Sequence, residues 1–86
     1  MAELKFNLEM DGIGWLYRSA LFLAQEKEKE AIIFLDKANN QLNKYINKDF
    51  IALINSPEKY LTNRKQKCFW AEKVLDEYHR ICRLLR

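Results

Sequence analysis

The scarcity of glycine and proline constrains the fold of this chain most strongly. Its 86 residues include only two Gly and one Pro. A β-sandwich or β-barrel needs a turn residue about every 8–12 positions, whereas helices need few. Hydrophobic residues make up 49% of the chain, which is enough to form one core in a chain of this size. The sequence therefore predicts a single all-α domain over residues 1–86.

The N-terminal residues depart from the helical pattern. Residues 4–10 alternate between apolar and polar side chains, which is the two-residue period of a half-buried strand. Asp11 and Gly12 follow as a turn. Because a single strand has no partner in a helical chain, we expect residues 1–11 to form either a short strand paired with another chain or an extended arm laid on the helices.

Residues 13–47 carry the pattern of an amphipathic helix. The segment Trp15–Ala38 contains no Gly, Pro or Asn and consists mainly of strong helix formers. At 100° per residue one stripe is apolar, and its members are Leu16, Ala20, Leu23, Ala24, Ala31, Phe34, Leu35, Ala38, Leu42 and Tyr45. The charged run Glu26–Glu30 is either the exposed middle of one helix or a corner between two antiparallel helices. Since nothing in that run is a typical helix cap, the sequence favours one continuous helix reaching about Ile46.

A second pattern in this region favours a pair of helices instead. It consists of large and small residues at Trp15, Ser19, Phe22, Ala31, Leu35 and Ala38. This spacing is similar to that of a tetratricopeptide helix pair, in which small residues allow the helices to approach closely. The similarity covers one repeat unit, and Arg18 stands where that pattern has an apolar residue. We therefore do not assign the chain to that family.

The clearest boundary signal lies in the middle of the chain. Residues 48–54 predict a short middle helix. Ser56, Pro57 and Glu58 are typical of an N-cap and a first helical turn, so a helix should begin at Pro57. The segment from about 57 to 86 either runs unbroken or restarts at Asn63, which with Gln66 forms a second capping pattern.

The C-terminal segment shows spacings of three and four residues between apolar positions. These positions are Cys68, Ala71, Leu75, Tyr78, Cys82 and Leu85, as at the a and d positions of a coiled coil. Val74 and Ile81 widen the stripe to the width of a bundle helix. Two long helices and a short middle helix predict a helical hairpin or a small helical bundle.

No group of residues predicts catalysis or ligand binding. His79 is the only histidine, and Cys82 follows three residues later. A zinc site normally needs four ligands, and acid–base catalysis needs a positioned partner that the sequence does not offer. We therefore expect no enzyme activity, no metal, no cofactor and no small-molecule substrate.

The cysteines and the N-terminus favour the cytoplasm. Cys68 and Cys82 are separated by about 21 Å if they share one helix, which is too far for a bridge between them. Free thiols fit a reducing compartment. The N-terminus lacks the basic region of a secretory signal, and the apolar run Ile13–Ala24 is too short to span a bilayer.

Large apolar residues outside the main stripes predict a binding surface for a partner. A two-helix hairpin cannot bury apolar groups on both faces. Either the middle segment covers them or another chain does. The candidate partner-binding residues are Trp15, Phe22, Ile33, Phe69, Lys73, Arg80 and Leu84. The sequence therefore predicts a protein–protein interaction or regulatory adaptor module that associates with a protein partner or with itself as a homodimer.

Charge supplies an alternative prediction. The net charge is +3, and residues 48–86 carry nine Lys/Arg against five Asp/Glu. A small nucleic-acid-binding regulator that uses this basic C-terminal helix is the alternative function. Glu72, Asp76 and Glu77 lie among the basic residues, however, and would repel phosphate. The interleaved charges are typical of a solvated helix face.

Overall fold

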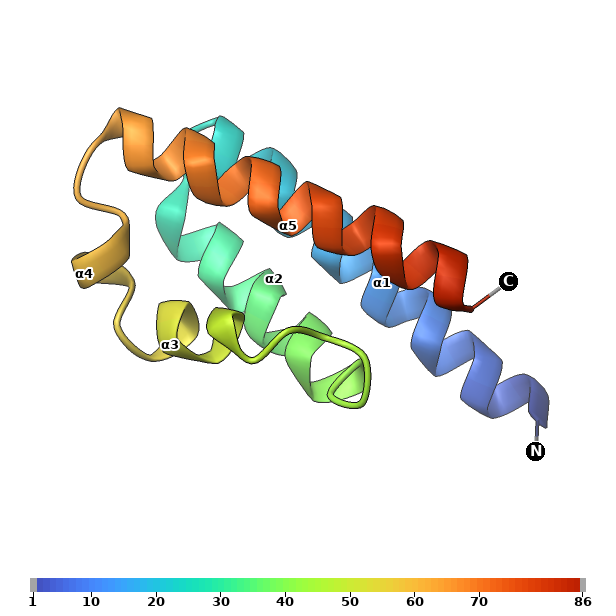
Figure 1. The fold of residues 1–86 in the computed structure, drawn as a ribbon. Helices are drawn as coiled ribbons and strands as arrows, with labels where there is room; N and C mark the ends of the chain where they lie inside the picture. Colours follow the sequence, from blue (N-terminus) through green and yellow to red (C-terminus); the bar gives the residue numbers. More distant parts are fainter. Residues whose placement is uncertain (1, 86) are drawn as a thin grey trace.

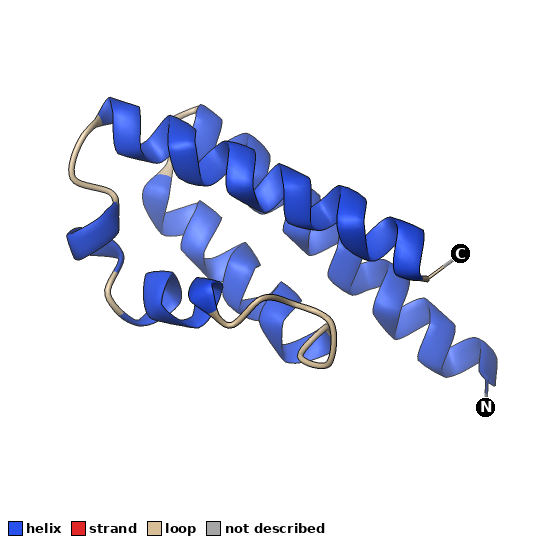
Figure 2. Ribbon diagram, in the orientation of Figure 1, coloured by secondary structure: helices blue, strands red, loops and turns tan. Residues whose placement is uncertain are grey.

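Five helices make up the described part of the chain, which comprises residues 2–85, with side chains from residue 11 onward (Figures 1 and 2). In this computed structural model they are α1 (Ala2–Ala24), α2 (Glu28–Gln41), α3 (Asp49–Asn55), α4 (Pro57–Tyr60) and α5 (Arg64–Leu84). No strand occurs within residues 2–85. The all-α prediction is therefore confirmed.

The two longest helices, α1 and α5, run antiparallel and side by side, so that both ends of the chain lie at the same end of the molecule (Figure 1). Helix α1 also packs along α2, and α3 and α4 connect α2 to α5. Because α1 contacts both α2 and α5, the core forms where these three helices meet. Its members include Leu16, Leu23, Leu35, Leu42, Val74 and Ile81, all with no exposed surface.

The prediction of a strand or extended arm over residues 1–11 is wrong. Residues 2–11 form the N-terminal half of α1, which continues unbroken to Ala24; Met1 lies outside the described residues. A helix pairs its backbone groups within its own segment, whereas a strand needs a neighbouring strand that this chain does not supply. Gly12 and Gly14 do not interrupt α1, since neither has a positive φ.

The prediction of one continuous helix through Glu26–Glu30 is also wrong. Helix α1 ends at Ala24, and Glu26 has φ 61°. The backbone N–H of Lys27 donates to the carbonyl of Phe22 at 2.8 Å, and that of Glu26 donates to the carbonyl of Leu23 at 3.1 Å. This is the Schellman arrangement, which usually has glycine in the left-handed position. The corner carries no glycine, so the usual sequence signal is missing.

Small residues allow α1 and α2 to approach closely beyond this corner. Ser19 is fully buried, and its hydroxyl donates to the carbonyl of Ala31 at 2.9 Å. A Cβ atom added at Gly12 would lie 2.7 Å from Cγ of Leu42, so any larger residue at that crossing would have to displace the Leu42 side chain. The spacing that resembles a tetratricopeptide pair thus marks a close-packed helical hairpin.

The chain reaches α5 through two short helices. Helix α3 buries Phe50 and Leu53, as the sequence predicts for the middle segment. Helix α4 begins at Pro57, which confirms the predicted start, but it ends after four residues. Helix α5 restarts at Arg64, where the side-chain oxygen of Asn63 accepts the N–H of Gln66 at 2.9 Å.

Helix α5 turns a different face to the core than its a/d spacing predicts. Its buried residues are Trp70, Ala71, Val74, Glu77 and Ile81. Of the six predicted a/d positions only Ala71 is buried, Cys68 is exposed, and the other four are half-buried. The buried face is therefore rotated toward Glu77, which leaves an apolar edge of the helix outside the core.

Replacing Glu26 with glycine should stabilise the protein. Glycine adopts a positive φ without the steric cost that a Cβ imposes, so we expect Glu26→Gly to raise the free energy of unfolding by about 0.5–1 kcal/mol. Glu30→Gly, within α2, is the matched control and should lower it by about 1 kcal/mol. Urea denaturation followed by circular dichroism measures both. An equal loss in the two variants would contradict the assigned turn.

Candidate interaction surface

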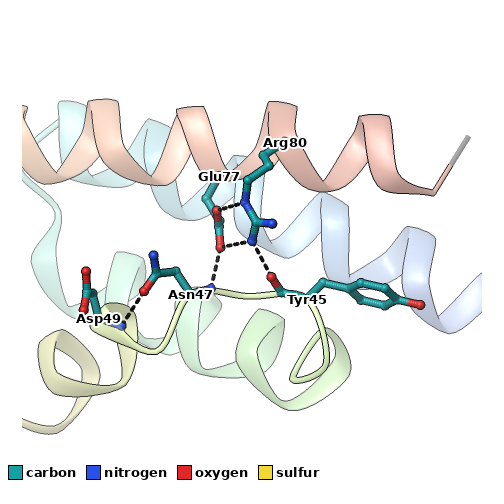
Figure 3. Close-up of polar contacts among 5 residues, drawn as sticks. All are labelled: Tyr45, Asn47, Asp49, Glu77 and Arg80. Atoms are coloured by element: carbon teal, nitrogen blue, oxygen red, sulfur yellow. Dashed lines mark hydrogen bonds and ion pairs between the residues drawn. The ribbon is translucent and has the colours of Figure 1, made fainter.

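A buried carboxylate fixes α5 against the loop that follows α2. Glu77 is only 6% exposed. Its Oε2 accepts the backbone N–H of Asn47 at 2.5 Å, and its carboxylate also accepts Nε of Arg80 at 2.7 Å and Nη2 at 2.8 Å. Arg80 in turn donates to the carbonyl oxygen of Tyr45 (Figure 3). We call this group, with Tyr45, Asn47, Glu77 and Arg80 as its members, the Glu77 anchor.

In the Glu77 anchor, the positive charge of Arg80 balances the negative charge of the buried carboxylate. The hydrogen bonds that Arg80 donates to Glu77 raise the pKa of the Arg80 guanidinium, so this side chain stays charged beside the carboxylate. A carboxylate with so little exposure needs such partners, because an unpaired buried charge is costly. The rotation of α5 is therefore determined by a polar requirement as well as by its apolar residues.

An apolar stripe remains uncovered along the junction of α1 and α5. We call it the α1/α5 stripe; its members are Tyr17 and Leu21 on α1 and Cys68, Leu75, Tyr78 and Cys82 on α5. Tyr17 is 41% exposed and Leu21 is 43% exposed. The rings of Tyr17 and Tyr78 join the two helices, with centroids 5.2 Å apart. Partial burial is the main cause that raises the pKa of Tyr78, and the adjacent Cys82 adds to it.

The stripe includes a groove of about 310 Å³ between the two helices. The groove is lined by large side chains next to small ones, namely Tyr17, Ala20, Leu21, Ala24, Cys68, Ala71, Glu72 and Leu75. Glu72 is the one charged residue among these lining residues. A mainly apolar groove between two helices has the form that receives the apolar side of a third helix.

Two of the predicted partner-binding residues, Trp15 and Phe22, stack on a ring of α2. Their rings lie on either side of Phe34 of α2, with centroid distances of 5.1 Å and 5.2 Å. The ammonium group of Lys37 lies 4.6 Å from the Trp15 ring centroid, and Arg18 also approaches that ring. Trp15 and Phe22 are half-buried, so α2 already covers part of their surface.

The other predicted partner-binding residues are distributed over separate places. Ile33 is 55% exposed and lies on the side of α2 that faces α4. Phe69 is exposed near the start of α5, with Lys73 5.4 Å from its ring centroid. Arg80 belongs to the Glu77 anchor, and Leu84 is exposed at the far end of α5. The seven predicted residues therefore do not form one surface.

Several basic residues of α5 contact other side chains of the same chain. Lys67 forms an ion pair of 2.5 Å with Glu28, and the hydrogen bond in this pair raises the pKa of Lys67. Lys73 lies over the rings of Phe69 and Trp70. Arg80 pairs with Glu77. Three cations of the helix thus have contacts within the chain.

Sequence reasoning missed Tyr17 and Leu21 as surface residues. A signal was present, because the a/d spacing of α5 marks a continuous apolar line. That spacing does not distinguish a line that faces the core from one at the edge of the molecule, where most of this line lies. Tyr17 and Leu21 are four residues apart and therefore occupy one side of α1 next to it.

Removing the carboxylate of Glu77 should destabilise the fold. Glu77→Ala leaves the Asn47 N–H and the Arg80 guanidinium without their acceptor, and we expect the free energy of unfolding to fall by about 2–4 kcal/mol. The neighbouring Asp76 is exposed, so Asp76→Ala should change it by no more than about 0.5 kcal/mol. Urea titration compares the two variants. Equal effects would show that the anchor contributes nothing to stability.

Some features of known sites do not occur in the described residues. They contain no group of three His, Cys, Asp or Glu side chains placed to hold a metal ion. None of the described helices is long and apolar enough to cross a membrane. Comparison of the chain with protein-family models, with curated proteins and with solved structures finds no match.

Proposed function

We propose that this chain is a non-enzymatic protein–protein interaction module that associates with a second copy of itself through the α1/α5 stripe. The observation that supports this most strongly is the exposure of Tyr17 and Leu21 beside half-buried Leu75. These side chains line one groove, so their apolar area is contiguous. Burying such an area against another chain is favourable in proportion to the apolar surface removed from water.

The shape of the stripe favours a second copy as its occupant. A two-fold interface uses the same surface on both chains, so that surface must complement itself. The lining of the groove supports this, because bulky Leu21 and Leu75 lie next to small Ala20, Ala24 and Cys68. Large side chains of one copy can therefore enter the hollow that small side chains leave in the other.

A small nucleic-acid-binding regulator is the alternative proposal. Arg64, Lys65 and Arg83 are exposed on α5 and are available to phosphate. The pairing of Lys67 and Arg80 with carboxylates reduces the basic character of the helix. An affinity for duplex DNA or RNA that falls steeply with rising salt would favour this alternative.

A charge placed in the stripe should prevent self-association. In a dimer, Leu21→Lys would bury an unpaired ammonium group, whereas in the free chain this position has access to water. We expect the wild-type chain to sediment at twice its mass of 10.4 kDa. The Leu21→Lys variant should sediment as a single chain and should keep the wild-type circular dichroism spectrum.

The matched control is Ile33→Lys, which changes an exposed aliphatic residue at the middle of α2, away from the stripe. This variant should dimerise like the wild type. A wild-type chain that sediments at 10.4 kDa at every concentration would refute the proposed function. Dissociation by Ile33→Lys alone would place the interface elsewhere.

A further inference from the structure

Three residues of α5 form a straight line that is symmetric about the middle of the helix. Cys68, Leu75 and Cys82 follow one another at seven-residue intervals, which return to nearly the same side of a helix. Helix α5 spans Arg64–Leu84, so Leu75 lies next to its midpoint. Each cysteine is therefore about 10.5 Å from Leu75 along the axis, in opposite directions.

We propose that two copies of the chain pair their α5 helices antiparallel, with the two-fold axis at Leu75, so that Cys68 of each copy faces Cys82 of the other. This inference rests on the proposed self-association through the α1/α5 stripe and specifies its geometry. Leu75 then packs against Leu75 of the second copy at the axis. The cysteines lie at the same height on either side of it.

The charges beside this line favour the antiparallel direction. Glu72, His79 and Arg83 are exposed and share one flank of α5, since spacings of seven and eleven residues differ from whole turns by about 20°. An antiparallel pair brings Glu72 close to His79 and Arg83 of the second copy. In a parallel two-fold pair, the flank that carries Glu72 faces the opposite flank of the second helix, so Glu72 would not meet His79 or Arg83 of the second copy. The helix dipoles also favour the antiparallel pair.

The size of the side chains permits a close approach. Cys68 and Ala71 are small and line the groove, so the backbones of two α5 helices can come near each other there. Both cysteines are free, Cys68 is exposed and Cys82 is half-buried. A disulfide needs Cα atoms about 4.4–6.8 Å apart, which paired cysteines on closely packed helices can reach. The two thiols of one chain are about 21 Å apart along α5, so a disulfide has to join two chains.

Oxidation by diamide tests this pairing with the full chain. Each bridge forms when two thiols lose one hydrogen atom each, and the azo group of diamide takes up both hydrogens and becomes a hydrazine. We expect wild-type chains to become covalent dimers on a non-reducing gel. Cys68→Ser alone and Cys82→Ser alone should remain single chains. An equimolar mixture of the two variants should cross-link roughly half of its chains, the share that random pairing places in mixed dimers.

A variant that stays monomeric shows whether cross-linking occurs within a dimer or between chains that collide by chance. Leu21→Lys keeps both cysteines, and because it should not associate, it should not cross-link under the same conditions. Equal cross-linking of Leu21→Lys and the wild type would overturn the inference.

Two other outcomes concern the direction of the pair and the association itself. Cross-linking of either serine variant with itself would indicate parallel helices and would overturn the geometry, while the proposed function would stand. A wild-type chain that sediments as a dimer but forms no covalent dimer would also overturn the antiparallel geometry. A wild-type chain that sediments as a monomer would remove the proposed function together with the inference.

Discussion

The hydrogen bonds of one buried carboxylate determine how α5 lies in this molecule. Glu77 needs partners because it is almost excluded from water. The Asn47 N–H and the Arg80 guanidinium supply them. Leu42, Ile46 and Phe50 are buried on both sides of that loop, so the position of Asn47 is fixed by the core. Helix α5 must therefore present Glu77 to this loop, and its rotation follows.

The rotation has a direct consequence for the surface. With Glu77 turned inward, Val74 and Ile81 enter the core, because they lie three and four residues away on the same side of the helix. The line of Cys68, Leu75 and Cys82 is then left at the edge next to α1. The apolar surface that we propose for self-association thus arises from a polar contact on the other side of the helix.

The helical character of the chain could be predicted from the sequence, and so could the helix start after Ser56. The restart after Asn63 was one of two alternatives that the sequence left open. Glycine and proline are scarce, and capping residues are local signals that do not depend on distant contacts. A corner in Glu26–Glu30 was one of two alternatives, and the sequence did not favour it, because a charged residue occupies the position where glycine is the usual signal. The alternation in residues 4–10 indicated a strand, but a strand needs a partner, and the segment forms helix instead.

Prediction of the candidate site was limited by the same dependence on distant contacts. The apolar line of α5 was visible, but its spacing does not say whether it faces a core or a second chain. The burial of Glu77 helps to decide this, together with that of Val74 and Ile81, and the burial of Glu77 depends on a loop thirty residues earlier. Trp15 and Phe22 were correctly identified as lying away from the core centre. Their cover by Phe34 follows from the corner at Glu26, which folds α2 back along α1.

We propose that a second copy of this chain covers the α1/α5 stripe. Methyl resonances in nuclear magnetic resonance spectra, recorded over a dilution series, test it most directly, because they report on individual side chains. We expect the methyl signals of Leu21 and Leu75 to shift as the protein is diluted, while those of Ile33 stay constant. Constant signals at Leu21 and Leu75 in a protein that is dimeric at high concentration would contradict it.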